Sequence, residues 1–251
     1  MQKNNSYKDT KIYKNYERAI QWNIEFGAKI NDKPQTKMEK STIDYRYNII
    51  DEEVKELNEG FKKKDLVEIW DALCDILVTV YGALGTFGYP LKLDSSFYSD
   101  QYADHFQEPN VEIFNNESAV KKMTNMLEMI NLSMTTLKEY CDECNLPKAA
   151  EILNLLVRLV LQFSYDATLD PNLGMQIVND SNFEKGCKTK DLATKSALAY
   201  RKGYQKKFYK AANFRVSANK KFYVVYDKES QKILKSIEWK EPDLAKYIYK
   251  K

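Results

Sequence analysis

The chain has 251 residues, 43% of them hydrophobic and 30% charged, which is the composition of a soluble globular protein with one large domain or one domain plus an appendage. No apolar run reaches the roughly 18 residues that span a bilayer, and the N-terminal sequence is unlike a signal peptide, so we expect a cytoplasmic protein (host cytoplasm, if it is viral) without membrane partners. Residues 1–185 contain 21 Lys/Arg and 30 Asp/Glu, whereas residues 186–251 contain 18 and 6, so an acidic body suited to divalent cations precedes a basic region suited to phosphates or nucleic acid.

Hydrophobic periodicity predicts mostly helix up to about residue 185. Ser41 or Thr42 can cap a helix that stops at Gly60, and Asp65 can cap the helix that follows. We expect helices at 13–26, 43–60, 66–84, 117–143, 147–166, 172–184 and 189–203, a loop at 92–116, and strands at 206–214 and 221–237 with a turn at 227–230.

The expected fold is therefore mainly α, with two parts. The first, over residues 1–185, is a four-helix-bundle core built from an acidic helix hairpin at 43–85 and a second half at 117–166. The second, over residues 186–251, is a small basic α+β region, a helix plus a β-hairpin, that we expect to act as a lid.

Three acids interrupt the apolar helix at residues 68–82, whose sequence is EIWDALCDILVTVYG. Glu68, Asp71 and Asp75 are spaced i, i+3 and i+7, so they lie on one stripe of the helix. An unpaired carboxylate in an apolar interior costs several kcal/mol. A stripe of acids at such positions therefore favours a functional interpretation.

The preceding helix contains a second acidic face, formed by Glu53 and Glu56 at i and i+3 with Glu52 beside them. The loop of about four residues between the two helices forces an antiparallel hairpin, in which this face can oppose Asp71 and Asp75. Converging carboxylates repel one another, and Mg²⁺, which prefers oxygen ligands, removes the conflict. Taken alone, the Glu53 face is better interpreted as a solvated surface.

Cysteine and histidine content argues against other metal chemistry. Cys141 and Cys144 form a C-x-x-C pair, but a zinc site needs two more ligands, and Cys74 lies inside the apolar helix. Reduced thiols are the simpler interpretation. A single histidine, His105, disfavours a histidine metal centre or a Ser-His triad.

A weak internal echo relates residues 68–91 to residues 151–174 without gaps. In this alignment Asp71 corresponds to Asn154 and Asp75 to Arg158, so the apolar pattern is kept while the acids are replaced. A chance match of two buried helices is as good an explanation as a duplication. We expect the second half to complete a four-helix core within one chain, and dimerisation through another surface stays open.

These motifs resemble the all-α nucleoside triphosphate pyrophosphohydrolases, the superfamily of MazG, phosphoribosyl-ATP pyrophosphohydrolase and the dimeric dUTPases. The resemblance is carried by E-x-x-E, the short loop and DALCDILVTVYG, and it is closest to a phosphoribosyl-ATP-pyrophosphohydrolase-like group of bacteria and phages. Further matches are Arg46 before the first acidic helix, the segment SNFEK at 181–185, and a tail of QKILK at 231–235 with PDL at 242–244.

The sequence departs from the family pattern in two places. The usual E-x-x-D would place Glu at Ala72, so Asp71 is expected to supply the second carboxylate from one position earlier. Asn179 and Asp180 replace a stretch that contains histidine in the family, and no role is assigned to them.

The resemblance implies cleavage of a (d)NTP between the α and β phosphates, giving a (d)NMP and pyrophosphate, with Mg²⁺ as cofactor and Mn²⁺ as a substitute. Glu53 or Glu56 would accept the proton of the attacking water. The implied metal ligands are Glu53, Glu56, Asp71 and Asp75, with Glu52 and Glu68 as additional candidates. The implied substrate contacts are Arg46, Asn182, Lys185, Lys232 and Lys235. The alternative is a non-catalytic nucleic-acid-binding protein that uses its basic C-terminal region; the family resemblance makes nucleic acid the less favoured partner.

Overall fold

The computed structural model describes residues 10–92 and 108–249, and these form two compact units. Unit 1 comprises residues 1–20, 30–178 and 243–251, and unit 2 comprises residues 21–29 and 179–242. The single boundary expected after residue 185 therefore differs from this division, in which the chain passes between the units more than once. The expected loop at 92–116 lies mostly outside the described residues.

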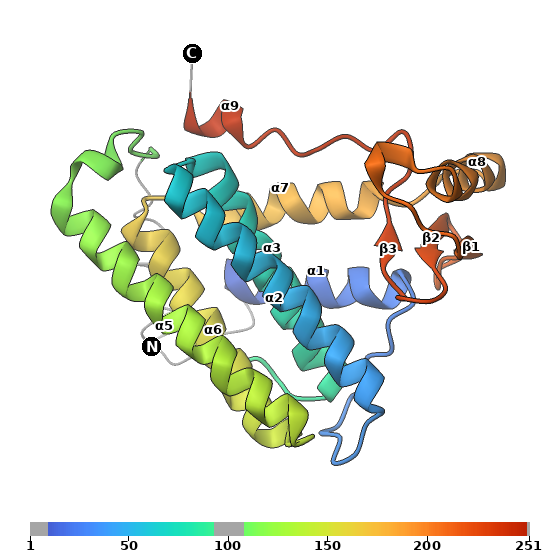
Figure 1. Ribbon diagram of the computed structural model, residues 1–251, viewed down its shortest axis with the longest axis horizontal. Coiled ribbons are helices and arrows are strands. Elements are labelled where there is room, and N and C mark those ends of the chain that lie inside the picture. The colour runs from blue at the N-terminus through green and yellow to red at the C-terminus, as the bar shows by residue number, and fades with distance from the viewer. Residues whose placement is uncertain (1–9, 93–107, 250–251) are drawn as a thin grey trace, which may run out of the picture. The chain divides into compact units, whose positions relative to one another are not determined.

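The core of unit 1 is a four-helix bundle of two antiparallel hairpins, α2–α3 and α5–α6 (Figure 1). Within the bundle α3 packs against α6 and α2 packs against α5. The mainly helical fold is thus confirmed, and so is the packing of the second half against the acidic hairpin. The helices are α2 (Lys40–Lys63), α3 (Leu66–Phe87), α5 (Glu117–Asp142) and α6 (Leu146–Asp166).

Helix boundaries follow local chemistry with two exceptions. The Asp65 side chain accepts hydrogen bonds from the backbone N–H groups of Val67 and Glu68, which confirms it as the cap of α3. The expected stop at Gly60 is wrong, because α2 continues to Lys63 and ends at Lys64 in the left-handed conformation. The expected cap at Ser41 or Thr42 is also wrong: α2 already begins at Lys40.

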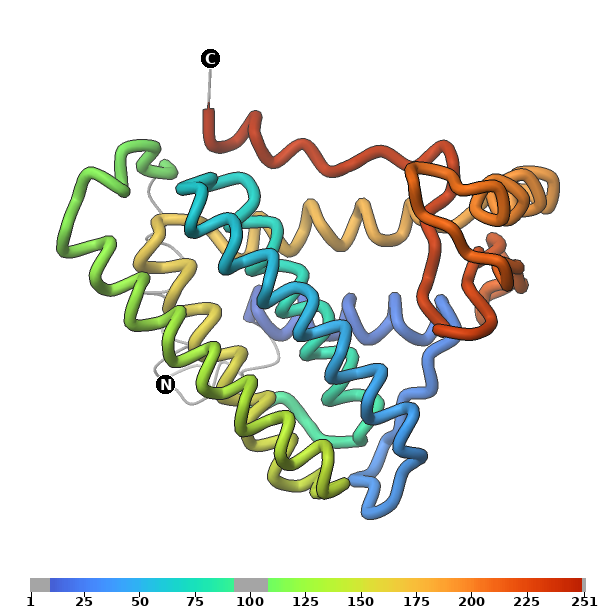
Figure 2. Tube along the Cα trace, in the orientation of Figure 1, coloured from blue at the N-terminus to red at the C-terminus, as the bar shows by residue number. Residues whose placement is uncertain are grey.

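The two hairpins repeat each other at a spacing of 80 residues. Lys64 and Cys144, which follow α2 and α5, both have positive φ, and so do Gly88 and Thr168, which follow α3 and α6. The backbone hydrogen bonds repeat with them. The N–H of residue 65 donates to the carbonyl of residue 60 and that of 145 to 140, while the N–H of 89 donates to 84 and that of 169 to 164. The Cα trace of the two hairpins can be followed in Figure 2.

Burial repeats with the same spacing, because the inward positions of α2 recur in α5. Ile43, Ile50, Val54 and Leu57 correspond to Met123, Ile130, Met134 and Leu137, and all eight are buried. The alignment at 83 residues expected from the sequence is therefore wrong by three positions, almost one helical turn. In the structural alignment the counterpart of Asp71 is Glu151 and the counterpart of Asp75 is Leu155.

Unit 2 contains an antiparallel sheet of order β1-β2-β3, against which α8 packs. Its core consists of Cys187, Ala193, Ala197, Tyr200, Ala212, Val225 and Leu234. The first expected strand, 206–214, is shorter and shifted toward the C-terminus, and a third strand extends the expected hairpin. The elements are α8 (Lys190–Arg201), β1 (Ala212–Val216), β2 (Tyr223–Asp227) and β3 (Ile233–Leu234).

The described residues also contain two short 3₁₀-helices, η3 (Ile113–Asn115) and η4 (Tyr204–Lys206), and three further α-helices. These α-helices are α1 (Lys11–Glu25), α7 (Pro171–Glu184) and α9 (Ala245–Ile248). Helices at the positions of α1 and α7 were expected from the sequence. The helix α9, which has four residues and packs against α3, was not expected.

Candidate functional site

The acid stripe of α3 lies at the boundary between core and solvent. Seventeen of the 22 residues of α3 are buried, whereas Asp71 and Asp75 are half-buried. The helix is thus surrounded by protein on most of its circumference and leaves one stripe partly accessible, the side on which both carboxylates lie.

The close contact between α2 and α3 determines which acids of the two helices lie at the same height along the helix axes. A Cβ added at Gly60 would lie 3.1 Å from both the Cβ of Glu68 and the backbone N of Ile69, so Gly60 lets the helices approach at the hairpin turn. Counting away from this contact in antiparallel helices at 1.5 Å per residue places Glu53 level with Asp75. By the same count Glu56 lies within one residue of the level of Asp71.

A third carboxylate acts on the same region of α3. Burial raises the pKa of the Cys74 thiol well above its ordinary value of 9.0, and the negative charges of Asp71, Asp75 and Asp170 raise it further. Asp170 caps α7 by accepting from the N–H groups of Asn172 and Leu173, and its own carbonyl accepts from the Trp70 indole. The acids of α3 and Asp170 therefore create one negative field around Cys74.

Arg46 lies on the buried face of α2, with 5% of its surface exposed. Burial lowers its pKa to about 10, so the guanidinium stays charged at neutral pH. Counting from Gly60 places Arg46 level with Gly82, seven residues beyond Asp75 on the same stripe of α3. The arrangement provides a cation about 10 Å along the helix axis from Asp75.

The remaining predicted acids differ in their surroundings. Glu68 is exposed and accepts from Lys63 Nζ at 2.9 Å, which holds it at the hairpin turn. Glu52 and Glu56 are exposed, and Glu53 is half-buried. Within residues 10–92 and 108–249, no three or more His, Cys, Asp or Glu side chains are grouped closely enough to hold a metal ion.

The other predicted substrate contacts belong to unit 2, where two tryptophans hold the SNFEK segment. The indole N–H of Trp239 donates to the Ser181 carbonyl at 3.0 Å, and that of Trp22 donates to the Asn182 carbonyl at 2.9 Å. Lys185 Nζ lies 5.9 Å from the ring centroid of Trp22 and 6.0 Å from that of Trp239. Two consecutive carbonyls and one ammonium are thus fixed by the same pair of rings.

The basic tail joins this group, which we call the indole cluster: Trp22, Ser181, Asn182, Lys185, Lys235 and Trp239. Lys235 Nζ lies 3.6 Å from the Trp239 ring centroid, and the Ser236 N–H donates to the Lys185 carbonyl. The structure therefore brings predicted residues Asn182, Lys185 and Lys235 together. Lys232 lies at the start of β3, where its carbonyl accepts from the Asp227 N–H.

Buried polar atoms occur in the same segment of α7. Asn179 is completely buried, and among the described residues neither of its side-chain polar atoms has a hydrogen-bond partner; the same holds for Ser181 Oγ. Buried polar groups are normally paired with protein or water. This end of α7 thus carries hydrogen-bonding capacity that the described side chains do not use.

Sequence reasoning missed Trp22, Trp239 and Asp170. Trp22 lies 160 residues from Asn182 and Trp239 lies 58 residues from Ser181, so no local spacing connects either indole to the segment it holds. The D-P-N pattern at 170–172 does indicate a helix cap. Nothing in that pattern indicates proximity to α3.

Comparison with known proteins finds a family match over the segment that contains the acidic hairpin. Residues 22–94 match the family model of phosphoribosyl-ATP pyrophosphohydrolase, a MazG-like family of the all-α pyrophosphohydrolase superfamily, and this segment includes all of α2 and α3. The chain is also 28% identical over 245 residues to an uncharacterized protein, L479, of Acanthamoeba polyphaga mimivirus, covering 92% of this chain and 94% of that protein. No solved structure matches the chain.

Within the described residues no single helix is long and apolar enough to cross a membrane. By length and composition alone, α6 and α7 would be as a pair, but they are bent by 113° relative to each other.

Proposed function

Because residues 22–94 carry a phosphoribosyl-ATP pyrophosphohydrolase domain, a family whose name points to pyrophosphate-releasing chemistry on nucleotides, we propose that this protein is a Mg²⁺-dependent nucleoside triphosphate pyrophosphohydrolase. It cleaves a (d)NTP between the α and β phosphates and releases a (d)NMP and pyrophosphate. The observation that carries the proposal is the half-buried pair Asp71 and Asp75 on α3, with Glu53 of α2 at the level of Asp75.

The donor chemistry of this site suits magnesium, because carboxylate oxygens are the ligands that Mg²⁺ prefers. Glu53, Glu56, Asp71 and Asp75 would hold the ion, with Mn²⁺ as a substitute. Bound Mg²⁺ would polarise the phosphate and lower the pKa of a bound water. No three of these described carboxylates are grouped closely enough to hold an ion in their present rotamers, so joint coordination would need different side-chain rotamers.

The residues of the chain have separate tasks in this proposal. Glu53 or Glu56 accepts the proton of the attacking water, since each carboxylate belongs to α2, opposite the acid stripe. Arg46, buried and still charged, neutralises phosphate oxygens. Asn182 and Lys185, with Lys232 and Lys235, contact the base and the phosphates of the substrate.

A second function, nucleic-acid binding by the basic C-terminal region, has one observation in its favour: aromatic rings and lysines lie together in the indole cluster, as on stacking surfaces for single strands. The half-buried Asp71 and Asp75 have no purpose in such a protein. Gel-shift titration with a single-stranded oligonucleotide separates the two functions.

The experiment is a pyrophosphate-release screen over all NTPs and dNTPs with and without Mg²⁺. Asp75→Asn should abolish release, because it removes a metal-binding charge, and it should leave unfolding stability equal or higher, because it relieves repulsion. The matched control is Glu59→Gln, an exposed acid one turn further along α2 than Glu56. Release by Asp75→Asn at the wild-type rate in saturating Mg²⁺ would contradict the site assignment, and no release from any nucleotide would contradict the function.

A further inference from the structure

Two indole N–H groups pair with carbonyls at the C-terminal end of α7. The last four carbonyls of a helix have no partner within it, and in α7, which ends at Glu184, those of Ser181 and Asn182 belong to this group. Trp239 Nε1 donates to the Ser181 carbonyl at 3.0 Å, and Trp22 Nε1 donates to the Asn182 carbonyl at 2.9 Å. Both tryptophans and the segment that they hold belong to unit 2, whose residues are all described.

The faces of both rings are in contact with other side chains of unit 2. Trp22 stacks on Phe26 with ring centroids 4.8 Å apart, and Phe26 in turn meets Phe183 edge-on. Lys235 Nζ lies 3.6 Å from the ring centroid of Trp239. Each indole is thus held by a contact to its face, while its N–H edge holds the end of α7.

The segment that the indoles hold contains two predicted substrate contacts, Asn182 and Lys185. The ammonium of Lys185 lies 5.9 Å from the ring centroid of Trp22 and 6.0 Å from that of Trp239. The Ser236 N–H donates to the Lys185 carbonyl at 3.1 Å. Hydrogen bonds to their carbonyls therefore fix the backbone of both predicted contacts, and loss of an indole N–H releases part of it.

The same end of α7 has buried hydrogen-bonding groups that a ligand can use. Asn179 is completely buried, and among the described residues neither polar atom of its side chain has a partner; the same holds for Ser181 Oγ. An amide offers both donors and an acceptor, as the edge of a nucleobase does. Burying such groups without partners is unfavourable, and a ligand that pairs with them removes that penalty.

We propose that Trp22 and Trp239 are positioning residues of the nucleotide site, whose indole N–H groups hold Asn182 and Lys185 where these two residues contact the substrate. This role rests on the proposed function, in which Asn182 and Lys185 contact the base and the phosphates. The tryptophans act through the backbone of α7, and the cleavage step belongs to the acids of α2 and α3. Removal of an indole N–H therefore weakens nucleotide binding and leaves the chemical step unchanged.

Nucleotide binding in EDTA tests this role without an activity measurement. Isothermal titration calorimetry of the wild type with each NTP and dNTP identifies the nucleotide that binds most tightly. Trp22→Phe and Trp239→Phe keep an aromatic ring and remove the N–H, so each should raise the Kd of that nucleotide about fivefold, as expected for one lost hydrogen bond. The matched control is Trp70→Phe, which removes the N–H that donates to the Asp170 carbonyl in unit 1 and should leave the Kd unchanged.

Steady-state kinetics separate positioning from a role in stability alone. In saturating Mg²⁺ Trp22→Phe and Trp239→Phe should raise KM about fivefold and keep kcat within about twofold of the wild type. All measurements are made at a temperature at which thermal unfolding shows each variant to be folded. Variants that melt earlier but keep the wild-type Kd and KM overturn the proposal, as does a fall in kcat at unchanged KM.

The outcomes distinguish this role from the proposed function. Pyrophosphate release by the wild type, combined with unchanged Kd and KM in both variants, overturns the positioning role alone. Binding in EDTA that both variants weaken, combined with absence of release by the wild type, overturns the hydrolysis and supports positioning for nucleotide binding. Absence of binding by every nucleotide in EDTA at millimolar concentration overturns the positioning role whatever the release assay gives.

Discussion

Cys144 differs from the other three cysteines in its exposure. It follows the end of α5 at positive φ and is exposed, whereas Cys74, Cys141 and Cys187 are buried. Burial raises the pKa of Cys141 to about 11 and raises those of Cys74 and Cys187 as well. The C-x-x-C pair thus consists of one buried thiol with a raised pKa and one accessible thiol.

Thiol reactivity should follow this difference. We expect a chromogenic disulfide reagent at pH 8 to modify about one thiol in the native protein and all four after denaturation, because the thiolate is the reactive form and access is required. Cys144→Ser should remove the fast reaction. Fast modification that persists in Cys144→Ser would show that a buried thiol becomes accessible.

Among the helices, the residues with positive φ at the helix ends mark the 80-residue repeat. Gly88 has φ of +78°, and a Cβ added there would lie 1.9 Å from the Lys33 carbonyl oxygen, so both the conformation and the space require glycine. Lys64 ends α2 at φ of +58° and is exposed. The left-handed conformation thus requires glycine at position 88, whereas a lysine adopts it at position 64.

Two substitutions measure this contrast. Gly88→Ala should lower the free energy of unfolding by about 3 kcal/mol or more, since backbone must move in addition to the left-handed strain. Lys64→Gly should change it by less than about 1 kcal/mol, because relief of strain is offset by unfolded-state entropy. Urea denaturation gives both values, and equal effects would mean that contact with Lys33 does not matter.

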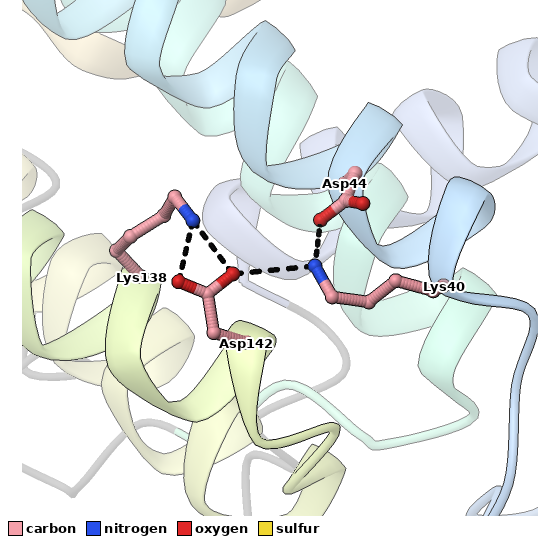
Figure 3. A network of polar contacts seen from close by, with 4 residues as sticks. All are labelled: Lys40, Asp44, Lys138 and Asp142. Carbon is pink, nitrogen blue, oxygen red and sulfur yellow. Dashed lines mark hydrogen bonds and ion pairs between the residues drawn. The ribbon is translucent and has the colours of Figure 1, made fainter.

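An ion network joins α2 to α5 near the start of one and the end of the other (Figure 3). Lys138 Nζ lies 2.6 Å from Asp142, and Lys40 contacts both Asp142, at 3.2 Å, and Asp44. Hydrogen bonds from Lys138, and then from Lys40, hold the pKa of Asp142 below its ordinary value of 3.8. All four side chains are roughly half exposed, at 42–50%, so the network stabilises the bundle only weakly.

The pH dependence of this network has a definite sign. A carboxylate whose pKa is lower in the folded state stabilises the protein above its unfolded-state pKa, and that contribution is lost as pH falls through the folded value. Asp142→Asn should therefore lower the melting temperature slightly at pH 7, and the difference from wild type should shrink below pH 4 and in high salt. A difference that is independent of both pH and salt would assign the effect to packing.

For the whole molecule, the C-terminal residues return to unit 1 after the chain has formed unit 2. Leu244 and Ile248 are buried, and the Tyr247 ring meets Trp70 edge-on with centroids 6.5 Å apart. Residues 243–249 therefore contribute to the stability of the helical bundle and not to that of the sheet that precedes them.

Ile248→Ala tests whether the C-terminal residues stabilise unit 1. Removing a side chain that is 4% exposed should lower the free energy of unfolding of the helical unit by about 2–4 kcal/mol. Lys246→Ala, at an exposed position of the same short helix, should leave it within about 0.5 kcal/mol. Denaturation followed by helical circular dichroism checks both, and equal effects would mean that α9 contributes little packing.

Local patterns in the sequence were sufficient for much of the fold and for part of the candidate site. The apolar period of 3.6, the Asp65 cap and the short connection after α2 defined the acidic hairpin, because each acts within a few residues. The stripe of Asp71 and Asp75 followed from helical geometry alone. The family match at residues 22–94 is confined to this locally determined segment and its immediate flanks.

Tertiary structure decided what depends on distant contacts. The repeat at 80 residues was misplaced by three positions, because a shift of three residues rotates a helix by only about 60° and the apolar faces still match. Left-handed residues at the helix ends, together with burial, fixed the true alignment. Likewise Trp22 and Trp239 hold the SNFEK segment, and α9 returns to α3, through contacts between residues far apart in the chain, which no local pattern can encode.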